Sequence, residues 1–231
     1  MISVIIPTYN EEGYIGATVG AVLRAARKDL LAEVIVVDGG STDGTTKEAE
    51  AAGARVITSL RKGRAVQMNV GAENAQGTIL YFLHADSIPP GGFTQRIIDD
   101  ARETIAGCFR LRFDHRHWFL RANCWFTRFD IQAFRYGDQS LFVKADAFQR
   151  TDGFNEQLVI FEDNEIITRL KKIGSFKVLP FCVQTSARKY LENGIYRMQG
   201  VFYLMWFMYS LGYSQEKLVN TYRVLIRQDK I

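Results

Sequence analysis

The chain has 231 residues, of which 47% are hydrophobic, and its 29 Lys and Arg against 25 Asp and Glu give a net charge of +4. This length suffices for one domain with an appendage, and the composition excludes collagen-like, low-complexity and disordered chains. No stretch reaches the roughly 18 apolar residues that a membrane-spanning helix needs. Because the first residues lack a basic leader and the three cysteines are widely spaced, we expect a cytoplasmic protein with reduced thiols.

Short apolar runs alternate with helical segments through the first half of the chain. The predicted strands cover residues 2–6, 33–37, 54–58 and 78–83, and the predicted helices cover residues 11–27, 45–52 and 64–75. Strands that are apolar on both faces and alternate with helices are typical of βαβ units in a buried parallel sheet. We therefore expect an α/β fold with a mostly parallel, open sheet flanked by helices.

The second half is less regular and ends in a helical tail. We expect helices over residues 94–104 and 163–173, strands over 107–113, 140–143 and 176–179, and tail helices over 194–211 and 214–227. The tail, residues 181–231, has seven Lys and Arg against three acids, so the whole net charge of the chain lies there. This excess is too small to indicate nucleic-acid binding.

Polar side chains follow three of the predicted strands at the point where each strand ends. The clusters are Thr8-Tyr9-Asn10, Asp38 to Asp43, and His84-Ala85-Asp86. Ligands of open α/β sheets bind outside the carboxyl ends of the strands, so the three clusters should meet at one edge. The local alternative is helix capping, with Thr45 and Glu48 as a capping box. A P-loop is excluded because Thr45 stands where that motif requires lysine, and no GxGxxG motif follows the first strand.

Four segments, in this order, resemble the family 2 glycosyltransferases. They are residues 3–12, Val36 to Asp43, His84 to Asp86, and Glu162-Asp163, and the resemblance extends from about residue 2 to residue 174. Residues 63–69 and 137–139 resemble a small bacterial subgroup of this family, with His-Ala-Asp in place of the Asp-x-Asp motif. The resemblance implies a GT-A fold with a catalytic domain over residues 1–180. Its nucleotide-binding half covers about residues 1–90 and its acceptor half about residues 91–180.

The resemblance also implies a binding site for a nucleotide-sugar donor. Its implied residues are Pro7, Thr8, Tyr9, Glu11, Asp38, Arg64, His84, Ala85 and Asp86. Asp38 would bond the base or the ribose, but Gly39 stands where family members often have a second acid, which leaves the base preference open. Arg64 would meet the diphosphate, because a guanidinium can bond two oxygens at once.

A divalent cation, Mn²⁺ or Mg²⁺, is the implied cofactor, because a leaving diphosphate needs its charge neutralised. Asp86 is the implied metal ligand. His84 replaces the first acid of the family motif. Its imidazole would bind Mn²⁺, donate to a phosphate, or bond only the backbone.

Glu162 and Asp163 open a predicted helix. The helix dipole alone favours acids at this position, but the resemblance implies the general base that deprotonates the acceptor, Asp163 in preference to Glu162. Asp138 and Gln139 are predicted acceptor contacts. No second carboxylate is identifiable as a nucleophile, so we expect inverting sugar transfer to an acceptor hydroxyl, with a lipid-linked acceptor as one option. The alternative is a non-catalytic nucleotide-sugar-binding or membrane-associated scaffold.

Two further segments are rich in aromatic residues. Residues 110–135 are interpreted as an amphipathic helix whose aromatics pack on the core, with sugar stacking or contacts to an anionic acceptor as the alternative. His115 and His117 form only a weak metal motif. The tail run Val201 to Tyr209 is apolar on all sides. It either packs within the chain or in a homodimer, or lies peripherally on a membrane surface.

Overall fold

Four parallel strands come from the first half of the chain. The computed structural model describes residues 1–131 and 137–227. The strands are β1 (Ile2–Thr8), β2 (Leu31–Asp38), β3 (Arg55–Thr58) and β4 (Ile79–Phe82), and the helices between them are α1 (Ile15–Ala25), α2 (Thr45–Ala51) and α3 (Arg64–Glu73). Each paired strand runs parallel to its neighbour, as the βαβ alternation predicted.

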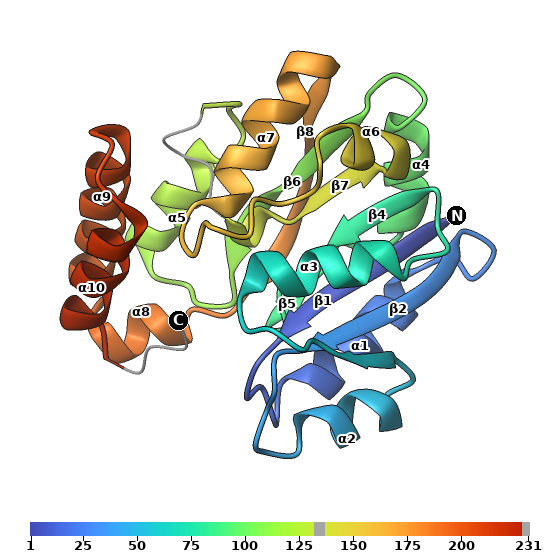
Figure 1. Cartoon of the computed structure of the whole chain (residues 1–231), viewed down its shortest axis with the longest axis horizontal. Helices are drawn as coiled ribbons and strands as arrows, with labels where there is room; N and C mark the ends of the chain where they lie inside the picture. Colours follow the sequence, from blue (N-terminus) through green and yellow to red (C-terminus); the bar gives the residue numbers. More distant parts are fainter. Residues whose placement is uncertain (132–136, 228–231) are drawn as a thin grey trace.

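The second half of the chain adds four more strands to the same sheet, with both parallel (β6 with β8) and antiparallel pairings (Figure 1). Its strands are β5 (Ser87–Ile88), β6 (Ala106–Phe113), β7 (Leu141–Lys144) and β8 (Phe176–Thr185). Its helices are α4 (Phe93–Asp100), α5 (Trp118–Phe126), the 3₁₀ turn η2 (Gly137–Gln139), α6 (Ala145–Arg150), α7 (Glu162–Ile173), α8 (Arg188–Asn193), α9 (Ile195–Ser210) and α10 (Gln215–Leu225). The strand order is β3-β2-β1-β4-β7-β6-β8-β5, and β7 runs antiparallel to both β4 and β6.

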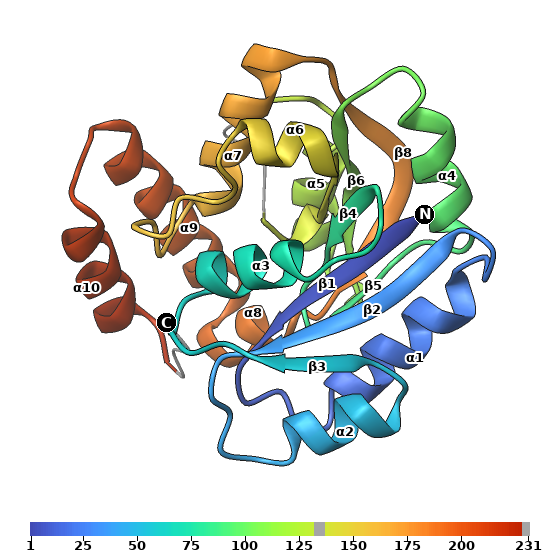
Figure 2. The same ribbon diagram turned by 45° about the vertical axis from the view of Figure 1, so that its right-hand side comes forward.

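Helices cover both faces of the sheet, as Figure 2 shows. Side chains of α1, α2 and α4 form one hydrophobic layer with Val4 and Ile6 of β1. Those of α3, α6 and α7 form the opposite layer with Ile5. Successive residues of a strand point to opposite faces, so a strand buried on both faces is apolar throughout.

Gly71 allows α3 to lie directly against β1 and β2. A methyl group at this position would collide with the side chains of Ile5 and Val37. The helix begins at Arg64, and in a βαβ unit a helix begins near the carboxyl end of the preceding strand. The close packing therefore holds Arg64 at the edge of the sheet where the polar clusters lie.

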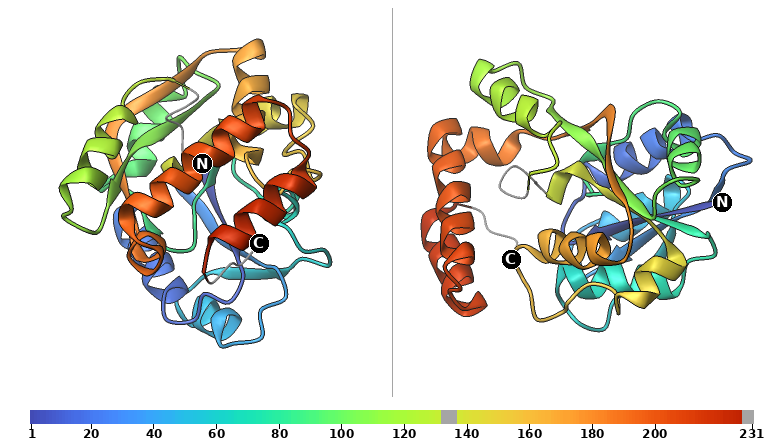
Figure 3. Two further views of the ribbon diagram at one scale, coloured as in Figure 1. Left: turned by 90° about the vertical axis from the view of Figure 1, so that its left-hand side faces the viewer. Right: turned by 90° about the horizontal axis from the view of Figure 1, so that it is seen from above.

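The tail helices form a third hydrophobic cluster together with α5. Its buried side chains include Leu120, Val201, Met205 and Leu218. Figure 3 shows α8, α9 and α10 at one side of the molecule, and β1 and β2 run towards that side in Figure 1. The tail thus lies beside the carboxyl ends of the parallel strands. Strand β8 extends to Thr185, so the boundary expected at residue 180 falls inside a strand.

Candidate functional site

The loops that follow β1 and β2 are hydrogen-bonded to each other. The Asn10 amide N–H donates to Ser41 Oγ at 2.9 Å, and the Thr42 N–H donates to Asn10 Oδ1 at 2.9 Å. The Glu11 N–H donates to Thr45 Oγ1 at 2.8 Å. The predicted capping box is wrong, because Glu48 accepts hydrogen bonds from residues at the start of α1 instead of capping α2. These side chains join two loops, so helix capping alone does not explain the clusters.

Asp38 is held in one orientation by the turn that follows it. Its Oδ2 accepts from the N–H groups of Gly40 at 3.0 Å and Ser41 at 2.9 Å, and its Oδ1 accepts from the Ser41 hydroxyl. Sequence reasoning missed Gln67, which is buried next to this turn. Its Nε2 donates to the carbonyl oxygens of Thr8 at 2.8 Å and Val37 at 2.7 Å, and so fixes the ends of β1 and β2 together.

The remaining residues predicted around the nucleotide lie at the end of β1 and on the loops after β1 and β4. Pro7 and Thr8 end β1 and are buried. Tyr9 follows them, with Lys62 Nζ at 5.4 Å from its ring centroid. The Ala85 carbonyl accepts a 2.6 Å hydrogen bond from the Thr18 hydroxyl, which ties the loop after β4 to α1. Their role in holding a base and a ribose stays a prediction.

Arg64 connects α3 to the two acids that open α7. Its Nε donates to Glu162 Oε1, and its Nη2 lies 3.6 Å from Asp163 Oδ2. Glu162 is fully buried, whereas the Asp163 side chain is 13% exposed. Burial raises the pKa of Glu162 and the charge of Asp163 adds to this, while Arg64 opposes it. Phe161, which precedes the acids with a left-handed φ of 70°, packs on Tyr209 of α9 with ring centroids 4.7 Å apart.

His84 lies between Asp138 and Arg64. Its Nδ1 is 2.8 Å from Asp138 Oδ1, and its Nε2 is 3.4 Å from Arg64 Nη1. Burial lowers the pKa of His84, but the hydrogen bond and charge of Asp138 outweigh burial, so the pKa is raised. Burial raises the pKa of Asp138, but the hydrogen bond and charge of His84, together with the charge of Arg64, outweigh burial, so the pKa is lowered. The pair therefore favours an imidazolium beside a carboxylate.

Asp86 is paired with a tail residue that sequence reasoning did not include in the site. Arg188, the first residue of α8, has its Nη2 at 2.8 Å and 2.7 Å from the two Glu11 carboxylate oxygens, and at 3.4 Å from Asp86 Oδ2. Burial raises the pKa of Asp86 and the charge of Asp138 adds to this, whereas His84 and Arg188 oppose it. The only sequence signal for Arg188 was its place among the basic residues of the tail.

The implied cation can be tested against these residues. Within the described parts of the chain, no three His, Cys, Asp or Glu side chains form a group that could hold a metal. Asp86 offers one carboxylate, and Arg188 already contacts it. Mg²⁺ and similar hard cations are often bound by one or two carboxylates together with substrate phosphates and water. The residues therefore fit a cation that binds jointly with a diphosphate.

The other predicted residues lie in more structural surroundings. Gln139 is buried and donates to the carbonyl oxygens of Phe109 at 3.2 Å and Thr127 at 3.1 Å, so its contact with an acceptor stays a prediction. His117 caps α5 by accepting the Phe119 N–H at 3.3 Å. The ring centroid of His115 lies 6.4 Å from that of His117.

The arginine-rich and aromatic stretch is only partly as expected. An amphipathic helix, α5, is present and buries Leu120. However, Trp118 is 66% exposed and Trp125 is 48% exposed, so these rings do not pack on the core. Phe134 and Arg135 of the same stretch lie outside the described residues.

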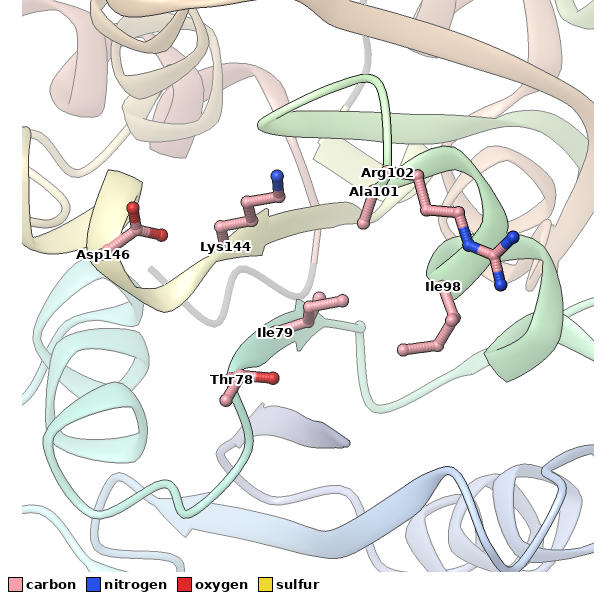
Figure 4. Close-up of a pocket in the computed structure, with 7 residues that line it drawn as sticks. All are labelled: Thr78, Ile79, Ile98, Ala101, Arg102, Lys144 and Asp146. Carbon is pink, nitrogen blue, oxygen red and sulfur yellow. The ribbon is translucent and has the colours of Figure 1, made fainter.

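Two hollows lie elsewhere on the molecule. One, of about 290 Å³, is at the start of β4 and is lined by residues that include Arg102, Lys144 and Asp146 (Figure 4). The other, of about 1180 Å³, is lined mainly by α3 and by the segment from α6 to α7. Neither is lined by Asp38, Asp86 or a residue in contact with them, so neither belongs to the site described above.

Comparison with known proteins defines the class of this protein. The family described as "Glycosyl transferase family 2" matches residues 3–156, and the chain therefore belongs to this family. The fold agrees. The chain superimposes on mannosyltransferase PcManGT from Pyrobaculum calidifontis, solved with GDP-Man and Mn²⁺, with a TM-score of 0.71 and 19% identity over 88% of this chain and 61% of that chain. The structure thus has the α/β fold of the GT-A type that the sequence predicted.

Two curated relatives show how far the similarity extends. The chain is 26% identical to the uncharacterized glycosyltransferase EpsJ of Bacillus subtilis, over 85% of this chain and 60% of EpsJ. It is 31% identical to the undecaprenyl-phosphate 4-deoxy-4-formamido-L-arabinose transferase of Aeromonas hydrophila, over 52% of this chain and 40% of that protein. The chain thus spans three fifths or less of the length of these relatives.

Proposed function

We propose that this protein transfers a sugar from a nucleotide-diphosphate sugar to an acceptor hydroxyl, with inversion at the sugar. The observation that carries the proposal is one set of contacts at the carboxyl ends of β1 and β4. In it, Arg64 meets both His84 of the family motif and the acids that open α7. These contacts support a site in which a diphosphate would lie near a base, and family membership agrees with it.

Residues around the hydrogen-bonded loops after β1 and β2 would bind the donor. Asp38, held by three hydrogen bonds, accepts from the base or the ribose. Tyr9 is on the loop after β1, which is hydrogen-bonded to the loop that follows Asp38. Arg64 and the His84 imidazolium face the diphosphate. Asp86 would hold Mn²⁺ or Mg²⁺ jointly with the phosphates, and the cation would neutralise charge on the leaving group.

The acceptor half falls to α7 and η2. Asp163 takes the proton of the acceptor hydroxyl while the hydroxyl oxygen bonds the anomeric carbon and the bond to the diphosphate oxygen breaks. Asp163 suits this role better than Glu162, because Glu162 is fully buried and bonded to Arg64. Asp138 would orient the acceptor from its place beside His84. A single displacement inverts the configuration at the sugar carbon.

A non-catalytic scaffold that binds nucleotide sugar is the second candidate. It is favoured by Gly39 and His84, which stand where the family often carries acids. Release of free nucleoside diphosphate from the donor separates the two functions, because a scaffold leaves the donor intact.

The cation role of Asp86 can be tested by calorimetry with UDP, GDP and dTDP, with and without Mn²⁺. We expect at least one of these to bind the parent protein, and Mn²⁺ to increase its affinity about tenfold or more. Asp86→Asn should fold normally and lose this increase, because the amide is a much weaker cation ligand. Asp99→Asn on α4, an exposed acid outside the site, is the charge-matched control. An equal Mn²⁺ effect in Asp86→Asn and the parent would contradict the assignment.

We also infer that α9 lies on an anionic lipid surface, which would suit a lipid-linked acceptor. Among the described residues, no helix is long and apolar enough to cross a membrane. Yet α9 exposes Tyr203, Leu204 and Phe207 along one side, with 41–55% of each residue accessible. Aromatic residues beside basic flanks are typical of helices at a membrane surface, and the tail carries the net charge of the chain. The name of the Aeromonas relative also includes a lipid phosphate.

A further inference from the structure

Arg188 reaches the donor side of the site from the opposite end of the chain. It lies 177 residues from Glu11 in sequence and stands at the junction between β8 and α8. Its guanidinium carbon is 4.4 Å from the centroid of the Tyr14 ring. The Arg188 side chain is 25% exposed, against 10% for Glu11 and 20% for Asp86. The guanidinium is therefore held at the site and remains accessible to a ligand.

The two carboxylates hold Arg188 unequally. Both oxygens of Glu11 lie within 2.8 Å of Nη2, which is normal hydrogen-bond distance, whereas the Asp86 oxygen is at 3.4 Å. Glu11 therefore anchors the guanidinium, and the contact with Asp86 is the one that can be exchanged. A guanidinium carries five N–H groups, so it can bond a phosphate oxygen and keep its contact with Glu11.

A cation that binds Asp86 would lie close to the positive charge of the Arg188 guanidinium. Arg188 and a divalent ion on the same carboxylate repel each other, which disfavours an ion bound without nucleotide. A diphosphate removes the conflict, because its oxygens can bond both the ion and the guanidinium. Arg188 would then keep Glu11 in both states of the site and exchange Asp86 for the diphosphate.

We propose that Arg188 is a donor-binding residue: it screens Asp86 while the site lacks nucleotide, and it binds the diphosphate when donor and cation enter. This inference rests on the proposed function. It also connects the donor site to the tail, because the neighbouring residues Ala187 and Tyr190 belong to the hydrophobic cluster of α9 and α10.

Arg188→Gln tests the proposal, with Arg197→Gln on α9 as the matched control, since Arg197 bonds only the Leu225 carbonyl among the described residues. Calorimetry in EDTA measures the affinity for the nucleoside diphosphate that the parent binds best. A second titration measures Mn²⁺ alone. We expect Arg188→Gln to lower nucleotide affinity about tenfold, or about 1.4 kcal/mol, and to bind Mn²⁺ more tightly than the parent does. The control should match the parent in both.

Removing Arg188 takes the guanidinium away from the largely buried Glu11 carboxylate, so a double variant, Glu11→Gln with Arg188→Gln, checks for misfolding. It should show a nucleotide loss at least as large as that of Arg188→Gln, with a melting temperature close to that of the parent. Parental nucleotide affinity in both variants, or Mn²⁺ binding no tighter than in the parent, would overturn the proposal. A parent protein that binds none of the nucleoside diphosphates would instead refute the proposed function, so the two failures are distinguishable.

Discussion

Two adjacent acids at the start of α7 have different surroundings, and these surroundings separate their roles. Glu162 is fully buried against Arg64, and within the described structure its Oε2 has no hydrogen-bond partner. Asp163 is partly exposed and lies 3.6 Å from the same arginine. A base must reach its substrate, so these surroundings support the proposal that Asp163 transfers the proton and that Glu162 positions Arg64.

Asp163→Asn should keep donor binding and lower sugar transfer roughly 10²-fold or more, because the amide cannot accept the acceptor proton. Turnover with the true acceptor measures the rate, and calorimetry with the nucleoside diphosphate measures donor binding. Glu165→Gln, two residues further along α7, should have parental turnover and serves as the control. Near-parental turnover of Asp163→Asn would move the base to Glu162 or Asp138.

The buried carboxyl of Glu162 makes a prediction about pH. Its folded pKa is raised above the ordinary value of 4.5, mainly by burial, so the folded state holds the proton more tightly than the unfolded chain does. The stability linked to this proton is present at low pH and is lost as pH rises through the folded pKa. We therefore expect the parent to lose stability relative to Glu162→Gln as pH rises from about 4.5. The difference between their unfolding free energies, measured by urea unfolding, should shift in favour of the variant.

Glu156→Gln provides a control of opposite sign. The pKa of Glu156 is lowered, first by its hydrogen bond from Asn69 and then by that from Arg61. Its contribution to stability is therefore present above the unfolded pKa and lost as pH falls, so this variant should approach the parent in stability as pH decreases. Parallel pH curves for Glu162→Gln and the parent would contradict the raised pKa.

At the scale of elements, α9 combines two roles. Val201, Met205 and Met208 face the chain and are buried, whereas Leu204 and Phe207, three residues apart, face outward. Residues three and four apart share one face of a helix. The run that is apolar on all sides is thus half core and half surface, so intrachain packing accounts for only part of it.

We expect the parent protein to float with anionic liposomes, and part of this binding to persist at high salt. Basic residues near anionic lipid contribute about 1 kcal/mol each, and this part fades with salt, whereas buried apolar area does not. Leu204→Ser with Phe207→Ser should remove the salt-resistant part. Leu23→Ser on α1, also exposed, is the control. A dimer without flotation would assign the face to a second copy, and a monomer that ignores liposomes would refute both.

In the whole molecule, segments that are distant in the sequence lie together at the site. Strand β7 enters the sheet antiparallel beside β4, and the turn η2 that precedes it brings Asp138 to His84. Strand β8 ends beside β5, which delivers Arg188 to Asp86 and Glu11. The second half of the chain, with the tail, thus adds residues to the cluster that the first 90 residues begin.

The sequence was enough to predict the βαβ half, the sheet edge where its polar clusters meet, and the acids that open α7. Hydrophobic periodicity and the chain direction of parallel units specify these features locally. The sequence could not predict that Asp138 pairs with His84, that Arg188 pairs with Glu11, or that Trp118 is exposed. These contacts depend on the order and direction in which β7 and β8 enter the sheet, and periodicity carries no information about either. A strand buried on both faces has the same apolar pattern whether its neighbour runs parallel or antiparallel.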